Sequence, residues 1–107
     1  MTLKQERAAP KRERVRLDRE WSAAVKARDG GVCQHCGSDR ALNGAHIFGK
    51  KAHPAVRHDV ENGVTLCWPC HRWWAHQEPV EFSEFVVGRL GRRRFNALRK
   101  RANMTGK

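Results

Sequence analysis

Four cysteines form two identical C-x2-C pairs, and His71 directly follows the second pair. Pairs at this spacing in a short, basic chain are typical of a tetrahedral zinc site, because each tight loop points two thiolates at one ion. In a reducing compartment such pairs bind metal rather than form disulfides. The sequence therefore predicts a structural zinc ion, with no open coordination position, on Cys33, Cys36, Cys67 and Cys70.

Three further polar residues follow in a fixed order: His46, Asn62 and His71. A neutral imidazole with a pKa near about 6.5 can take a proton from an attacking water or bind a divalent ion. An amide donates and accepts hydrogen bonds without adding charge. Taken singly, His46 is also explained as a packed histidine at a strand end, and Asn62 with Gly63 as a turn. His71 alone is also explained as a spare zinc ligand or a helix-surface residue.

Size and charge restrict the kind of protein. The chain has 107 residues, with 22 Lys and Arg against 11 Asp and Glu, and a net charge of +11. We expect one small domain stapled by metal, since hydrophobic burial alone is weak at this size. The charge favours nucleic acid as partner, and an acidic membrane surface second. Without a spanning run of about 18 apolar residues or an N-terminal apolar segment, we expect a soluble, cytoplasmic protein that is not secreted.

The positive charge lies at both ends. Residues 1–29 hold nine Lys or Arg and five Asp or Glu, residues 30–80 hold five and four, and residues 81–107 hold eight and two. A nearly neutral zinc core with cationic ends follows. We expect three segments: a flexible basic arm over residues 1–14, a zinc-bearing domain over 15–90, and a basic helix and tail over 91–107.

Apolar spacing predicts the elements that position the polar residues. Short strands are expected over residues 41–48 and 63–66, each next to one of these residues. A helix is expected to begin around Pro69 and carry His71, because proline is tolerated in a first helical turn. Three amphipathic helices are expected over residues 15–28 (Val15, Leu17, Trp21, Ala24 and Val25 inward), 80–90 (Phe82, Phe85, Val86 and Leu90 inward) and 92–102 (Phe95 and Leu98 inward).

The ordered set of two C-x2-C pairs, Ala45-His46-Ile47, Glu61-Asn62-Gly63 and Cys70-His71 resembles the HNH endonuclease family, in particular small phage-type members with a four-cysteine zinc site. The resemblance covers about residues 20–90. It implies an α+β fold, with a small ββα-metal core flanked by helices. It also implies DNA as substrate, a host-cell cytoplasm as location, and other phage proteins as partners.

The family's residue roles carry over by position. His46 stands where the general base stands, and Asn62 where an amide braces the base and the loop beside it. His71 stands where a histidine binds the catalytic ion, which would be Mg²⁺, Mn²⁺ or another divalent ion. The phosphate contact is expected from Arg57, in the segment between His46 and Asn62.

One departure from the family concerns that ion. Many members carry Asp or His directly before the base as a second ligand, and here that residue is Ala45. Many also carry a histidine four residues after the metal-binding one. Here that position is Ala75, and His76 is displaced by one residue, which rotates it by about 100° on an α-helix. This displacement weakens the case for His76, and the candidate partners of the ion are Asn62, Asp59, His58, Glu61 and His76.

Basic and aromatic residues give further expectations. Clustered cations favour phosphate contacts, which supply affinity rather than sequence recognition. The expected contacts are Lys50, Lys51, Arg92, Arg93, Arg94, Arg99, Lys100 and Arg101. Trp68, Trp73 and Trp74 are able to stack on bases. We expect at least two of these indoles to cover the small core instead.

The leading hypothesis is a metal-dependent DNA endonuclease or nickase in which His46 activates water. A non-catalytic, zinc-stabilised DNA-binding adaptor is the alternative, and Ala45 supports it. An RNA-binding zinc knuckle is a weaker third hypothesis. A monomer with one active site would nick, whereas a dimer, even a weak one, would allow paired cuts.

Overall fold

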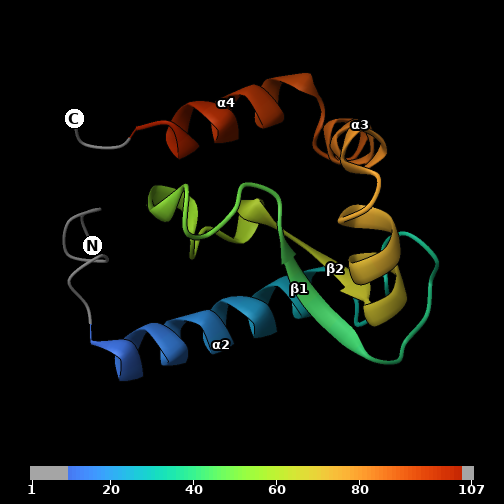
Figure 1. Cartoon of the computed structure of the whole chain (residues 1–107), viewed down its shortest axis with the longest axis horizontal. Coiled ribbons are helices and arrows are strands. Elements are labelled where there is room, and N and C mark those ends of the chain that lie inside the picture. Colours follow the sequence, from blue (N-terminus) through green and yellow to red (C-terminus); the bar gives the residue numbers. More distant parts are fainter. Residues whose placement is uncertain (1–9, 105–107) are drawn as a thin grey trace.

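The computed structural model describes residues 10–104, in which helices surround a small antiparallel sheet (Figure 1). Strands β1 (Leu42–His46) and β2 (Gly63–Cys67) pair in a register that sets Leu42 opposite Cys67 and His46 opposite Gly63. The two-stranded sheet with flanking helices confirms the predicted α+β class. One end of the sheet therefore leads into the zinc ligands, and the other end carries His46.

Helix α2 (Lys11–Arg28) packs on both strands through the buried side chains of Trp21 and Val25. Two glycines allow this close approach. A Cβ atom on Gly63 would lie 2.6 Å from both side chains, and one on Gly44 would lie 3.0 Å from the Trp21 ring. The expected helix starts at Val15, but α2 begins at Lys11, directly after Pro10. Val15 is 44% exposed because it lies beyond the part of α2 that contacts the short sheet.

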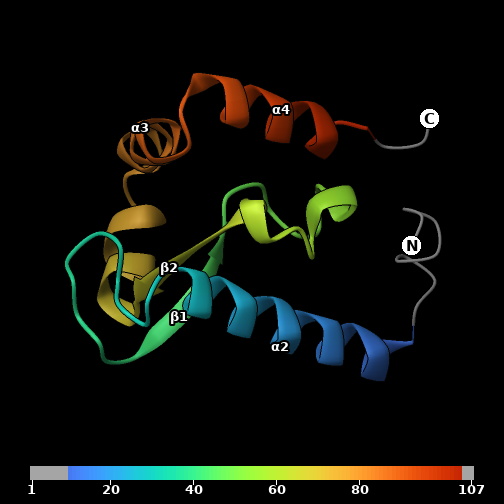
Figure 2. The same ribbon diagram turned by 180° about the vertical axis from the view of Figure 1, so that it is seen from behind.

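The chain between the strands forms a loop with two short 3₁₀ turns, η1 (Pro54–Val56) and η2 (Val60–Asn62). Both views place this loop between α2 and the last helix, α4 (Arg92–Ala102) (Figures 1 and 2). Val56 in the loop packs with Leu98 and Ala102 of α4 in a second apolar cluster. Phe95 and Leu98 point inward as predicted.

Helix α3 (Pro79–Leu90) precedes α4, and Gly91 separates the two with a φ of 85° that favours glycine. Its predicted inward residues are confirmed, since Val86 and Leu90 are buried and Phe82 and Phe85 pack against the zinc-side core. The buried Asp29 carboxylate joins α3 to the end of α2 through ion pairs with Arg89 and Arg28.

Between β2 and α3 lies a widened π-helical turn, η3 (Cys70–Ala75). Trp74 packs against the core from this turn, with Phe82 and Phe85 at its edges. Trp68 and Trp73 are instead 48% and 59% exposed. The expectation that at least two of the three indoles cover the core is therefore wrong. Trp74 and the two phenylalanines already cover this side of the core, and the turn directs the other indoles outward.

Candidate metal and nuclease site

The four cysteines meet where the loop after α2 approaches the end of β2. Their sulfur atoms lie within 4.8 Å of one another. Cys36 Sγ and Cys67 Sγ are 3.5 Å apart. A tetrahedral zinc with Zn–S bonds of about 2.3 Å would separate its sulfurs by about 3.8 Å, so the thiols fit this ion. Burial raises the pKa of Cys33, but hydrogen bonds from backbone N–H groups outweigh it and lower that pKa to about 6.

His35 supports the zinc ligands from inside the first C-x2-C loop. Its Nδ1 lies 3.3 Å from Cys70 Sγ, and its ring stacks on Trp74 with centroids 3.6 Å apart and planes inclined by 9°. Groups that contact metal ligands orient them and tune their basicity. His35 is exposed, yet it also connects the cysteine cluster to the core.

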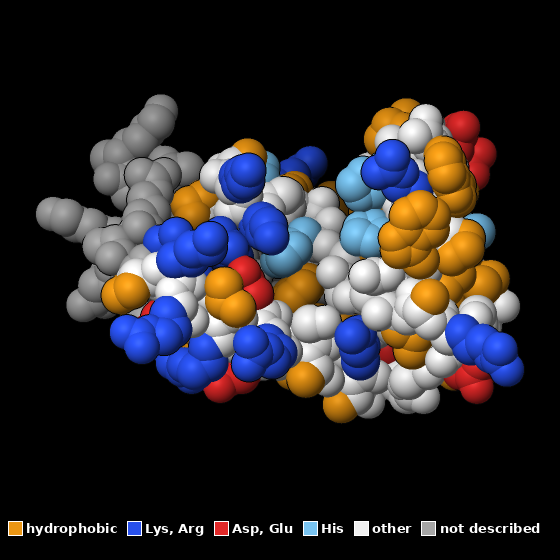
Figure 3. All heavy atoms as spheres, turned by 60° about the horizontal axis from the view of Figure 1, so that its bottom comes forward, with side chains coloured by type: hydrophobic (Ala, Val, Ile, Leu, Met, Phe, Trp, Pro, Cys, Tyr) orange, Lys and Arg blue, Asp and Glu red, His pale blue; other side chains and the backbone are white. Residues whose placement is uncertain are grey.

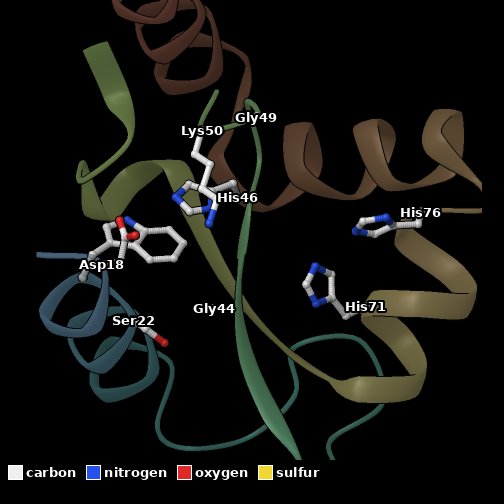
Figure 4. Close-up of a pocket in the computed structure, with 9 residues that line it drawn as sticks. Asp18, Ser22, Gly44, His46, Gly49, Lys50, His71 and His76 are labelled. Atoms are coloured by element: carbon white, nitrogen blue, oxygen red, sulfur yellow. The ribbon is translucent and has the colours of Figure 1, made fainter. Parts of the chain in front are cut away.

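A cleft of about 460 Å³ lies between α2, β1 and the η3 turn and is lined by three histidines (Figure 4). His46 comes from β1, and His71 and His76 come from η3 and the residue after it. Asp18 on α2 and Lys50 on the loop after β1 also line the cleft. The fold thus brings together His46 and His71, two of the predicted site residues, from opposite ends of the sheet.

His46 is held in one orientation by two contacts. Its ring stacks on Trp21, with centroids 3.9 Å apart and planes inclined by 6°. Its Nε2 lies 2.9 Å from the carbonyl oxygen of Arg57. Because a carbonyl only accepts, Nε2 carries the proton in neutral imidazole, and the lone pair belongs to Nδ1. Burial lowers the pKa of His46, and the charge of Lys50 lowers it further, so the ring is neutral at pH 7.

The expected phosphate contact, Arg57, points at a carboxylate in this structure. Its guanidinium donates to both oxygens of Asp18, at 2.9 and 2.7 Å, and its side chain is 19% exposed. His58 Nε2 donates to the same carboxylate at 2.8 Å. Hydrogen bonding from Arg57 lowers the pKa of Asp18 to about 2. The ion pair fixes α2 against the loop that carries the Arg57 carbonyl, and hence against His46.

Asn62 is buried, with no exposed surface, and uses its whole amide to hold the loop. Its Oδ1 accepts from Phe48 N at 2.8 Å, and its Nδ2 donates to the carbonyls of Phe48 at 3.0 Å and Val56 at 3.1 Å. One amide side chain thus satisfies three backbone groups without placing a charge in the interior. Asn62 therefore braces the segment between His46 and Arg57, and does not line the cleft.

His76 lies beside His71 despite its one-residue displacement, and it therefore stays among the candidate ligands. The two ring centroids are 4.9 Å apart. The sequence argument assumed α-helical spacing, but His76 N bonds to His71 O at 3.3 Å, which is the five-residue spacing of a π turn. That turn absorbs the extra residue, Ala75, and brings both imidazoles to the cleft. Burial lowers the pKa of His71, which keeps it in the neutral, metal-binding form.

The other proposed partners of the catalytic ion are held elsewhere. Asp59 and Glu61 form ion pairs with arginines of α4, and His58 pairs with a carboxylate of α2. Within residues 10–104, one group of three or more metal-binding side chains has its ligand atoms close together. This group consists of the four cysteines. The cleft therefore offers two histidines as possible ligands, His71 and His76. Ala45 adds no third ligand, because its methyl group cannot bind a metal.

The predicted cations differ in their surroundings. Arg94 pairs with Glu61 at 2.9 Å, and Arg101 pairs with Asp59 and Glu61 at 2.9 and 3.0 Å. Lys50 lines the cleft, whereas Lys51 is exposed beside it. Five cations of α4 are exposed, and Arg92, Arg93, Arg99 and Lys100 are the four of these for which no ion pair with a carboxylate is found in the described residues. Sequence analysis did not identify Asp18 or Trp21 as site residues, because their partners are distant in the chain.

A two-stranded antiparallel sheet followed by a helical turn, with histidines on both and a cysteine cluster at one end, defines a small ββα-metal fold. Residues 33–78 match the family model of the HNH endonucleases. The matched segment runs from the first zinc cysteine to just past His76. This match supports an HNH endonuclease domain over residues 33–78. No curated protein and no solved structure matched the chain.

No helix within residues 10–104 combines the length and the apolar character needed to cross a membrane.

Proposed function

We propose that this protein is a metal-dependent DNA endonuclease or nickase that hydrolyses phosphodiester bonds with a water activated by His46. The observation that supports this most is the fixed orientation of His46. A carbonyl bond on Nε2 leaves Nδ1 as the basic nitrogen of a neutral ring that lines the cleft. General base catalysis needs this protonation state and a fixed ring.

Two imidazoles would hold the catalytic ion, His71 and His76. When bound, a divalent ion supplies charge stabilisation to the phosphate and to the leaving 3′ oxygen. Water and phosphate oxygens would complete its coordination, since a loosely held Mg²⁺ keeps most of its waters. Imidazole also suits softer transition metals, so Mn²⁺ or Ni²⁺ would bind this pair better than Mg²⁺.

The residues around His46 hold it in place. Asn62 fixes the loop after β1, and the Asp18–Arg57 ion pair fixes that loop to α2. We assign Arg57 a positioning role through its carbonyl, and Lys50 the contact with the scissile phosphate or its neighbour. Lys50 is exposed and lines the same cleft as His46.

DNA would approach the face shown in Figure 3, where histidines lie between a region rich in Lys and Arg and a group of hydrophobic side chains. The first turns of α2 present a basic surface of Lys11, Arg12, Arg16 and Arg19. Exposed cations of α4 would add contacts to a strand that passes over the loop. These contacts give affinity and salt dependence.

The experiment is plasmid relaxation by the wild-type protein with Mg²⁺, Mn²⁺ or Ni²⁺, and with a chelator that leaves the structural zinc in place. We expect nicked circles with a divalent ion and none with the chelator. Ala45 favours the alternative, a zinc-stabilised DNA-binding adaptor that does not cut. DNA binding without nicking in any divalent ion would establish the adaptor and refute the nuclease.

A further inference from the structure

The two most exposed indoles of the described chain lie against each other beside the metal-binding histidines. Trp68 and Trp73 are 48% and 59% exposed, and their rings meet edge to face with centroids 6.1 Å apart. They are five positions apart, the same spacing that brings His71 and His76 together across the widened turn. The turn therefore presents two aromatic rings and two imidazoles on neighbouring parts of its surface.

A cation accompanies the rings. The guanidinium of Arg72 lies over the Trp73 ring, 5.5 Å from its centroid. Scattered single apolar residues on a surface are ordinary, but two large rings in contact with each other and with an arginine form a patch. Indole faces stack on nucleobases of any identity, and an arginine beside them meets the phosphate. This chemistry, in a chain with a net charge of +11, is complementary to nucleic acid.

Bases inside a duplex stack on each other, and their faces cannot reach a protein side chain. A ring that binds this patch must come from an unpaired nucleotide. Because Arg72 and Trp73 directly follow His71, that nucleotide would lie next to the phosphate at the cleft.

We propose that Trp68, Arg72 and Trp73 form a binding site for an unpaired nucleobase, and that the substrate is DNA with a single-stranded segment beside the cleavage point. This inference rests on the proposed nuclease function for its choice of DNA. The base-binding site itself requires only that nucleic acid binds the histidine face.

The test is fluorescence anisotropy without added divalent ion, so that no cleavage step enters the result. The wild-type protein and Trp73→Ala are titrated into a labelled oligothymidylate and a blunt duplex. We expect Trp73→Ala to bind the single strand about tenfold more weakly and the duplex with unchanged affinity. Trp73→Phe keeps a ring and should restore most of the single-strand affinity. Val80→Ala, which trims a 71% exposed side chain on α3, is the matched control and should change neither.

An equal loss for single strand and duplex, or no loss for either, would overturn the base-binding site. Tighter binding of the corresponding RNA strand would overturn the assignment to DNA. Zinc content measured for each variant shows that the fold is intact. If the wild-type protein does not nick plasmid DNA but binds single strands in a way that depends on Trp73, the nuclease proposal is refuted. The base-binding site is then still supported.

Discussion

The imidazole of His46 stacks on the indole of Trp21, with centroids 3.9 Å apart. The indole is itself fixed, because its Nε1 donates to the Asp59 carbonyl at 2.8 Å and its ring lies over Gly44 and Gly63. The general base proposed from β1 is thus held by a helix that precedes the matched family segment. His46 depends on α2 for both its orientation and its lowered pKa.

The pH dependence of nicking follows from that environment. Burial lowers the pKa of His46, and the proposed base acts only when neutral. The rate should therefore be on its plateau at pH 7 and fall with acid only below about 6.5, the ordinary value. Trp21→Leu removes the ring that stacks on His46. It should raise the midpoint pH of the acid limb toward about 6.5, because His46 becomes less buried. It should also lower the plateau rate about ten- to a hundredfold, because the imidazole is no longer held in place.

Initial nicking rates from about pH 5 to 8 at saturating metal give this profile, since His titrates in that range. Trp21→Phe keeps an aromatic ring under His46 and serves as the control, with a profile close to that of the wild type. A wild-type midpoint above 6.5 would show that the titrating group is not the buried imidazole.

His76 is proposed as the second ligand of the catalytic ion. His76→Ala should raise the metal concentration for half-maximal nicking by about tenfold or more, because one of two protein ligands is removed. Gln77→Ala changes the next exposed residue and should leave the metal dependence unchanged. Identical metal titrations for His76→Ala and the wild type would remove His76 from the site.

Ala45 occupies the position at which a carboxylate ligand is missing. It is 2% exposed and lines a hollow of about 260 Å³ together with His71 and His76. Ala45→Asp should therefore place an oxygen ligand beside the imidazoles and lower the Mg²⁺ concentration for half-maximal nicking about tenfold, since carboxylates suit Mg²⁺. Ala45→Asn has the same shape without the charge and should give a smaller change. Unaltered Mg²⁺ dependence in Ala45→Asp would contradict this placement.

Zinc is expected to hold the sheet and the two cysteine loops together. Structural zinc contributes roughly 10–16 kcal/mol in small peptides, so Cys67→Ser should lose the ion and the cooperative thermal transition. His35→Ala removes a neighbour of Cys70 and the ring stacked on Trp74 but no thiolate, and it should keep one zinc per chain. Metal analysis and circular dichroism check both variants. A folded Cys67→Ser protein without zinc would refute the structural role.

Much of the fold was predictable from local patterns. The C-x2-C spacing predicted the cysteine cluster, and apolar periodicity predicted both strands and the inward faces of α3 and α4. These features depend on neighbouring residues, for which sequence spacing is a sufficient guide. The cysteine pairs predicted the metal-binding set, whereas the α+β class was expected from the family resemblance.

The rest depends on contacts between distant segments. Asp18 reaches Arg57 across 39 positions of the chain. No local pattern marks Asp18 or Trp21 as part of a site. The placement of His76 beside His71 was not predictable because the sequence does not distinguish an α turn from a π turn, and the difference of one residue rotates a side chain by about 100°. The exposure of Trp73 belongs to the same turn.

The most direct test of the nuclease proposal is plasmid relaxation by His46→Ala beside His53→Ala with Mn²⁺. His53 is a loop histidine whose Nδ1 bonds to the Ala102 carbonyl at the end of α4, away from the cleft. We expect His46→Ala to nick at least about a hundredfold more slowly than the wild type, with zinc content and DNA affinity retained, while His53→Ala nicks normally. Nicking by His46→Ala at the wild-type rate would show that His46 is not the base.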